Sequence, residues 1–367
     1  MSNFETWNKL FKQQNLFKFN GNSNGLLWLK VRAVFRKDIL PKFLAYSQIT
    51  LSKTKTKEQQ EELFKILETD ESHYMSILDT FLQDTENEFY RQLNIDERQL
   101  VSDLYKITSY EWGGDYNNSL DRYLVSHYVK VISSYNELQS KFAEIGENAC
   151  KYVKLSWYNN WSSYLIESIF KRHSNVISAV GEIKSVDFFI GGMPFDLKVT
   201  FIPNEYQRVI RKDLGLKAEI TYLKNKAKEL SIEYDKDATD TQIQYEILEK
   251  LKQRNSDDSL AVLDEFMGQR TKVIERAKSE PKKLIKWLYE SQGSMRFGAE
   301  NRLFLVLIDS VDLDNSWKLK RDIERLRPAI NDYLDNFKNK NINDMLLSFE
   351  YSGRKYQTYS DVLFISK

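Results

Sequence analysis

The segment from residue 185 to residue 200 constrains the fold most, because it contains two strand-like runs separated by Gly191-Gly192. Two consecutive glycines readily adopt the positive φ angles of a two-residue hairpin turn. Folding about this turn places only apolar side chains on one face of the hairpin. On the other face, Asp187 lies directly opposite Asp196. We therefore expect a hairpin with one apolar face and one acidic face.

The acidic face of this hairpin brings two like charges together. Counted from the turn, Asp187 and Asp196 form a non-hydrogen-bonded pair, whose Cα atoms are about 4.5 Å apart. Like charges at this spacing destabilise a hairpin, and a hard divalent cation held by carboxylate oxygens would compensate. Lys198 lies on the same face, two residues along. The alternative is that both carboxylates are solvated on an ordinary hairpin, because acid-x-Lys triplets recur in a chain with 29% charged residues.

The composition is that of an ordinary globular protein. The chain has 367 residues, of which 41% are hydrophobic, and this length suits two domains. The longest purely apolar run, residues 303–308, is too short to cross a membrane. The first residues do not resemble a secretion signal, and the single cysteine, Cys150, fits a reducing environment. We expect a cytoplasmic protein that does not associate with membranes.

Hydrophobic spacing predicts a helical first half and a mixed second half. Apolar residues recur every three or four positions in residues 1–150 and again in 157–173, which indicates helices. The segment 204–292 is helical and highly charged, whereas 303–308 is typical of a strand buried on both faces. The other expected strands are residues 177–183, 185–190, 193–201, 346–351 and 356–366. These elements predict an α/β fold with a mixed sheet flanked by helices.

The pattern of charged residues resembles the PD-(D/E)xK nuclease superfamily, whose fold is shared by many restriction endonucleases. The resemblance rests on Asp187 after Val186, on Asp196-Leu197-Lys198 in the next strand and on Glu167 in the preceding helix. The order of elements over residues 157–309 also matches that family's core. Val186 replaces the family's proline, and a long charged helical stretch stands where the family usually has one helix.

The resemblance implies a metal-dependent endonuclease that acts on DNA, either a type II restriction-like enzyme or another prokaryotic defence nuclease. Asp187, Asp196 and the backbone carbonyl of Leu197 would bind Mg²⁺, for which Mn²⁺ can substitute. Glu167 would complete the ligand set. Lys198 would orient the attacking water and stabilise negative charge on the phosphate.

The expected domains are a helical, DNA-recognising domain over residues 1–150 and a nuclease domain over residues 151–367, with a helical insertion at about 214–290. Two segments carry side chains of the types that contact nucleic acids, namely the helix after the catalytic strand and the loop before the buried strand. The candidates are Gln207, Arg208, Arg211, Lys212, Gln292, Arg296 and Asn301. The alternative is that they form a solvated helix face and a connecting loop.

Several alternatives stay open at this point. Glu182 is the alternative to Glu167, and RNA is the alternative to double-stranded DNA. The chain is either a monomer or a homodimer. Instead of an enzyme, it is either a non-catalytic nucleic-acid-binding protein with a nuclease-like fold or a protein that binds other partners. The three histidines are scattered, which disfavours a zinc site, and no G-x-x-x-x-G-K-[ST] phosphate-binding loop occurs.

Overall fold

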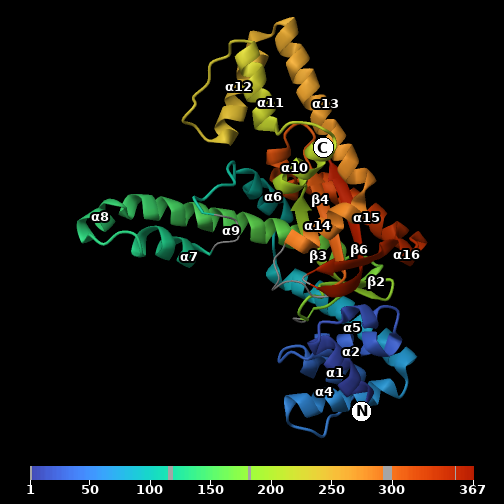
Figure 1. Ribbon diagram of the computed structural model, residues 1–367. Helices are drawn as coiled ribbons and strands as arrows, with labels where there is room; N and C mark the ends of the chain where they lie inside the picture. The colour runs from blue at the N-terminus through green and yellow to red at the C-terminus, as the bar shows by residue number, and fades with distance from the viewer. Residues whose placement is uncertain (1, 115–118, 181–182, 292–299, 352) are drawn as a thin grey trace. The chain divides into compact units, whose positions relative to one another are not determined.

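The computed structural model describes residues 2–114, 119–180, 183–291, 300–351 and 353–367 (Figure 1). The chain divides into two compact units, which we call the sheet unit and the helical unit. The sheet unit comprises Met1–Leu26, Gly192–Leu319 and Lys340–Lys367, and the helical unit comprises Leu27–Gly191 and Lys320–Asn339. The predicted domain boundary at residue 150 falls inside one long helix, α9 (Phe142–Lys171).

The helical unit confirms the helices expected in the first half of the chain. It contains α2 (Ser23–Val34), α3 (Leu40–Ser47), α4 (Thr56–Glu68), α5 (Glu71–Leu93), α6 (Glu97–Tyr105), α7 (Leu120–Leu124), η2 (Val125–Val129), α8 (Tyr135–Ser140), α9, α15 (Ile323–Asn336) and η4 (Phe337–Asn339). Local signals set their ends: the side chain of Asp70 caps the first turn of α5, and Asn94 closes that helix with a left-handed φ of 46°. The C-terminal part of α9 buries Leu165 and Ile169, as its apolar spacing predicts.

The first two strands are shorter than predicted. β1 (Val176–Ser178) and β2 (Phe188–Ile190) form an antiparallel pair in the helical unit. A turn occupies part of the expected second strand, because Ser185 has a φ of 71° and the Val186 N–H donates to the Ile183 carbonyl oxygen at 3.1 Å. The prediction of strands over 177–183 and 185–190 was therefore wrong at these ends, and Asp187 precedes β2 instead of lying within it.

The predicted glycine turn is confirmed. Gly191 and Gly192 have φ angles of 56° and 75°, and the type I′ turn of a two-residue hairpin requires positive φ at both positions. A side chain at Gly191 would also crowd Phe337, because a Cβ there would lie 3.2 Å from its ring. β3 (Met193–Phe201) begins directly after the turn.

The sheet unit contains a mixed sheet, which confirms the α/β class. β3 and β4 (Arg302–Ile308) are parallel, β4 and β6 (Arg354–Ser366) are parallel, and β5 (Leu346–Tyr351) is antiparallel to β6. Hydrogen bonding gives the strand order β1-β2-β3-β4-β6-β5, in which the last four strands belong to the sheet unit. Every residue of β4 is buried, as expected for a strand covered on both faces.

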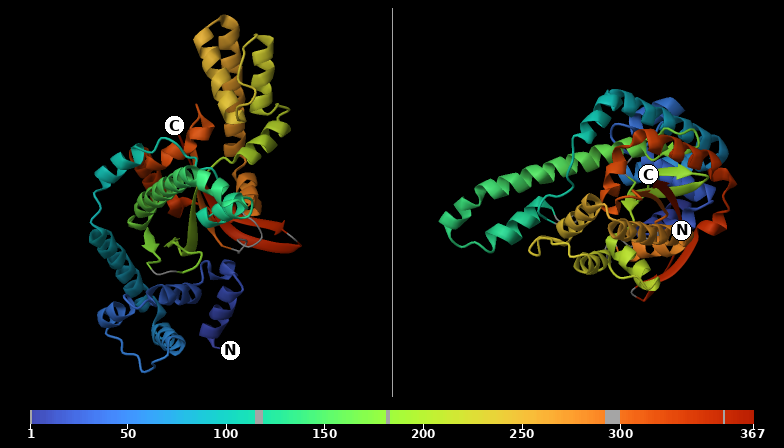
Figure 2. Two further views of the ribbon diagram at one scale, coloured as in Figure 1. Left: turned by 90° about the vertical axis from the view of Figure 1, so that its left-hand side faces the viewer. Right: turned by 90° about the horizontal axis from the view of Figure 1, so that it is seen from above.

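Helices cover the sheet of this unit and extend beyond it (Figures 1 and 2). Helices α10 (Asn204–Asp213), α13 (Asp257–Ser279) and α14 (Pro281–Ser291) pack on the face that carries Phe304, Val306 and Ile308. The expected helical insertion is present as α11 (Glu219–Glu229), α12 (Asp240–Arg254) and most of α13, which share an apolar core of their own. The remaining elements of the unit are α1 (Asn3–Lys12), η1 (Leu16–Phe19), η3 (Leu313–Arg321) and α16 (Ile342–Met345). None of the described helices is long and apolar enough to cross a lipid bilayer.

One buried cation gives the helical unit a testable pH dependence. Burial lowers the pKa of Lys320 to about 8, and its Nζ donates to Asn159 Oδ1 at 3.0 Å. In the unfolded chain a lysine has a pKa of about 10.4. At a pH between these two pKa values, Lys320 is neutral in the folded protein and charged in the unfolded chain, so unfolding takes up a proton. The free energy of unfolding therefore rises as pH increases from about 8 to about 10.4.

Replacing Lys320 by methionine should remove this dependence. At pH 7 we expect Lys320→Met to stabilise the protein by up to about 3 kcal/mol, because the cost of burying the charge disappears. Above about pH 10 the difference between variant and wild type should shrink towards zero. Urea unfolding of the full chain at pH 7, 8.5 and 10 measures this, with exposed Lys154→Met on α9 as the control. A difference that does not vary with pH would contradict the prediction.

Candidate active site

Two of the predicted catalytic residues meet on β3. Asp196 and Lys198 are two positions apart on one strand, so their side chains lie on the same face of the sheet. Lys198 Nζ donates to Asp196 Oδ1 at 2.6 Å. The carboxylate is 9% exposed and the lysine side chain 38% exposed. The buried anion is therefore held beside a cation that solvent can reach.

A second ion pair, which the sequence interpretation missed, adjoins the first. Arg302 begins β4 in register with Asp196, and its Nε lies 3.4 Å from Asp196 Oδ2. Its Nη2 donates to Glu300 Oε2 at 2.8 Å, and its side chain is only 4% exposed. Charges of alternating sign thus run from Lys198 to Glu300. The signal in the sequence was the pair of charged residues directly before the apolar run of β4.

Neighbouring polar groups fix the position of this ion-pair row. The Arg302 guanidinium lies over the ring of Tyr289, 4.9 Å from its centroid. Tyr289 and Thr358 both donate hydroxyl hydrogen bonds to the backbone oxygen of Glu300, at 2.7 and 2.6 Å. Burial raises the pKa of Tyr289 to about 12, so this hydroxyl stays protonated and remains a donor at neutral pH. The row is therefore anchored to α14 and β6.

Asn301, a predicted nucleic-acid contact, lies between Glu300 and Arg302 in the sequence and is fully buried. Its Nδ2 donates to the Pro194 carbonyl at 2.9 Å, and its Oδ1 accepts from the Tyr359 N–H at 3.1 Å. The same side chain is hydrogen-bonded to Asn20. These bonds join the start of β3, β6 and the N-terminal segment, which favours a structural role for Asn301.

The other two predicted catalytic residues, Glu167 and Asp187, lie in the helical unit. Glu167 Oε2 on α9 accepts from Lys171 Nζ at 3.0 Å. Burial lowers the pKa of Lys171, but the charges of Glu167, Glu86 and Asp187 together outweigh burial and raise it. Glu86 also accepts from the Ser178 hydroxyl at 2.7 Å. Three carboxylates thus create a negative potential at this point, although the sequence predicted only two of them.

The predicted magnesium ligands are distributed over both units. Among the residues that the structure describes, no three or more His, Cys, Asp or Glu side chains are grouped as a metal site. The predicted ligands are carboxylates and one backbone carbonyl, the hard oxygen donors that Mg²⁺ prefers. Asp196 already accepts from Lys198 and faces Arg302, but an ionised carboxylate has about four acceptor positions. Asp187 and Asp196 belong to different units, so their pairing stays a prediction that rests on the glycine turn.

Helix α10 presents some of its predicted nucleic-acid contacts and buries another. Arg208 and Lys212 are exposed, four residues apart on one side of the helix, and form no ion pair or side-chain hydrogen bond with the described residues. Arg211 is buried, and its guanidinium donates to the Lys217 carbonyl at 2.7 Å and to Gln269. Arg208 and Lys212 thus form a small basic patch on one side of α10, although the exposed carboxylates of Glu205 and Asp213 balance their charge over the whole helix. Arg211 supports the start of the helical insertion.

Of the remaining predicted contacts, one side chain forms a structural hydrogen bond, and the others lie outside the residues that the structure describes. Gln207 Nε2 donates to the Ile202 carbonyl at 2.8 Å, which ties α10 to the end of β3. Gln292, Arg296 and the alternative ligand Glu182 lie outside the described residues. On α10, Arg208 and Lys212 are thus the better-placed candidates for contacting a phosphate.

Comparison with known proteins adds no identification. No protein-family model matches the chain. No curated protein and no solved structure matches it either. The function is therefore inferred from the residues themselves, chiefly the ion pairs of β3 and β4 and the carboxylates around Lys171.

Proposed function

We propose that this protein is a Mg²⁺-dependent endonuclease that hydrolyses phosphodiester bonds in DNA and has a restriction-endonuclease-like core. The main support is the contact between Lys198 Nζ and Asp196 Oδ1, 2.6 Å apart on β3. A carboxylate that binds a cation and an ammonium that stabilises anionic oxygen are the two groups that such a site requires. The positive φ angles of Gly191 and Gly192 add support, because the role of Asp187 depends on that turn.

In this proposal the chain supplies oxygen ligands for a metal ion and a lysine that positions the attacking water. Asp187, Asp196, Glu167 and the Leu197 carbonyl would hold the Mg²⁺ ion, or Mn²⁺ in its place. When bound, the ion neutralises charge on the phosphate and promotes ionisation of a water molecule. Lys198 orients the water. The water oxygen bonds to phosphorus as its proton passes to solvent, and the bond from phosphorus to the leaving oxygen breaks as that oxygen takes up a proton from solvent.

Double-stranded DNA is the proposed substrate, and a prokaryotic restriction or defence role in the cytoplasm is the proposed context. The exposed cations Arg208 and Lys212 on α10 would contact backbone phosphates. We assign recognition of the duplex to the helical region of residues 1–150 and to the insertion α11–α13. This context rests on the likeness of the motif to restriction endonucleases and is part of the same proposal.

A cleavage panel tests the enzymatic activity. The purified full-length chain is incubated with plasmid, linear duplex, single-stranded DNA and RNA, in Mg²⁺, in Mn²⁺ and in EDTA. We expect nicking or linearisation of duplex DNA with either cation and no products in EDTA. If all four substrates stay intact over a range of protein concentrations, pH values and target sequences, the proposal fails. Cleavage that persists in EDTA would contradict the role of the cation.

A non-catalytic nucleic-acid-binding protein is the second candidate. The observation that favours it is that Asp196 already faces two cations, Lys198 and Arg302, so its charge is balanced without a metal ion. This candidate predicts salt-sensitive binding of DNA with no cleavage, and equal binding in Mg²⁺ and in EDTA. If no salt-sensitive binding occurs at all, both candidates fail, and a protein that binds other partners is the alternative.

A further inference from the structure

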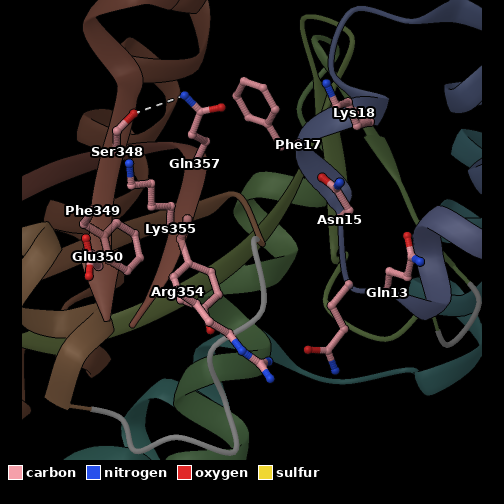
Figure 3. Close-up of a pocket in the computed structure, with 12 residues that line it drawn as sticks. Gln13, Asn15, Phe17, Lys18, Ser348, Phe349, Glu350, Arg354, Lys355 and Gln357 are labelled. Atoms are coloured by element: carbon pink, nitrogen blue, oxygen red, sulfur yellow. Dashed lines mark hydrogen bonds between the residues drawn. The ribbon is translucent and has the colours of Figure 1, made fainter. Parts of the chain in front are cut away.

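A cavity of about 770 Å³ lies within the sheet unit, separate from the β3 and β4 ion pairs (Figure 3). On one side is the N-terminal segment after α1, and on the other is the hairpin of β5 and β6. We call this cavity the hairpin groove, and its size is within the range of sites that hold small organic ligands. The lining residues are Gln13, Gln14, Asn15, Phe17, Lys18, Ser348, Phe349, Glu350, Arg354, Lys355, Tyr356 and Gln357.

The groove exists because β6 is longer than β4. β4 pairs with β6 only from Ser360 onwards, whereas β5 pairs with the part of β6 that precedes it. The hairpin therefore projects past the end of β4. The segment η1 packs beside it, where the rings of Phe17 and Tyr359 stack with centroids 5.3 Å apart at 13°.

The charge of the groove is positive. Lys18, Arg354 and Lys355 are exposed, and their side chains form no ion pair or hydrogen bond with the described residues. Glu350 is the one acidic residue among the lining side chains. Glu350 lies opposite Lys355 in the hairpin register, so the lining side chains carry three positive charges and one negative charge, and this excess of positive charge attracts an anionic ligand.

The other lining groups suit the bases of a nucleic acid. Four side-chain amides line the groove, from Gln13, Gln14, Asn15 and Gln357, and amides can both donate to and accept from base edges. Phe17 is half-buried, lines the groove and stacks its ring on Tyr359, so a base stacked on Phe17 would extend an existing pair of stacked rings. Unpaired bases stack on aromatic rings, whereas the bases of a duplex are already stacked on each other.

We propose that the hairpin groove binds one or two unpaired nucleotides of a nucleic-acid strand. A base would stack on Phe17, the amides would hydrogen-bond to its edge, and the cations Lys18, Arg354 and Lys355 would contact the phosphates. This binding site goes beyond the proposed nuclease function and does not depend on catalysis. It can therefore be measured in EDTA, where a failure of the nuclease proposal has no effect on the result.

The test measures binding of a fluorescein-labelled oligothymidine to the full-length chain by anisotropy, over a series of salt concentrations in EDTA. Removing two cations in Arg354→Ala/Lys355→Ala should weaken binding at least about tenfold and reduce the salt slope by about 1.4. Phe17→Leu keeps an apolar side chain and should weaken binding by about 5- to 100-fold through loss of stacking. The matched control Lys154→Ala removes an exposed, unpaired cation on α9 and should leave affinity nearly unchanged.

Three outcomes would overturn the proposal. The first is unchanged affinity and salt slope in the double variant, with circular dichroism like that of the wild type. The second is a matching loss of affinity for a blunt duplex of the same length, which would assign the groove to paired DNA. The third is displacement of the oligonucleotide by polyglutamate at equal charge concentration, which would assign it to an acidic peptide.

Discussion

Asp196→Asn should lower the rate of Mg²⁺-dependent DNA cleavage by about 10²- to 10³-fold, the effect of removing one key electrostatic group from an active site. The side chain keeps its shape but loses the charge that would bind the cation and that now faces Lys198 and Arg302. The measurement is single-turnover cleavage of a duplex substrate at saturating enzyme. DNA affinity in EDTA, measured in parallel, should change much less.

Asp361→Asn is the matched control for this variant. Asp361 is a mostly buried carboxylate of the same sheet, and it accepts from Lys340 Nζ at 2.6 Å. It is in register with Leu303, whereas Asp196 is in register with Arg302, so the two acids lie on opposite faces of the sheet. Asp196→Asn removes a carboxylate that contacts two cations and Asp361→Asn one that contacts a single lysine, but only Asp196→Asn should lose cleavage. Equal activity in the two variants would rule out Asp196 as a metal ligand.

Arg302→Met should destabilise the protein by about 3–5 kcal/mol, because removing one partner of a buried ion pair leaves an uncompensated charge. Arg302 is 4% exposed and contacts two carboxylates, Asp196 and Glu300. Methionine fills similar space but leaves both carboxylates without their shared cation. Urea unfolding of the full-length chain at pH 7 measures the change in the free energy of unfolding.

Two comparisons make the stability measurement specific. Arg276→Met breaks an ion pair with Glu280 in which the arginine is 44% exposed, and it should cost less than about 1 kcal/mol. In a double-mutant cycle, the effects of Asp196→Asn and Arg302→Met should not add, because each substitution breaks the same ion pair between the two residues. Additive effects, or an Arg302→Met cost as small as that of Arg276→Met, would mean that the ion-pair row does not stabilise the fold.

The sequence was most informative where structure depends on neighbouring residues. The apolar run of β4, the helical spacing of the first half and the turn at Gly191-Gly192 each carry their signal within a few residues, and each is confirmed. The strand ends near Ser185 were missed because a serine with positive φ has no local signature. The burial of Arg211 and Asn301 was also not predictable, because each has a hydrogen-bond partner far along the chain, Gln269 for Arg211 and Pro194 for Asn301.

Local sequence patterns were sufficient to predict the helices, most of the strands and the hairpin turn. They also predicted that Lys198 lies beside Asp196, because residues i and i+2 share a face on any strand. That Arg302 and Glu300 join this pair depends on tertiary packing, and so does the position of the β5–β6 hairpin beside residues 13–18. The difference lies in how far apart in sequence the interacting residues are. Periodicity and turn chemistry act over a few residues, whereas the parallel pairing of β3 with β4 depends on packing between segments that are distant in sequence.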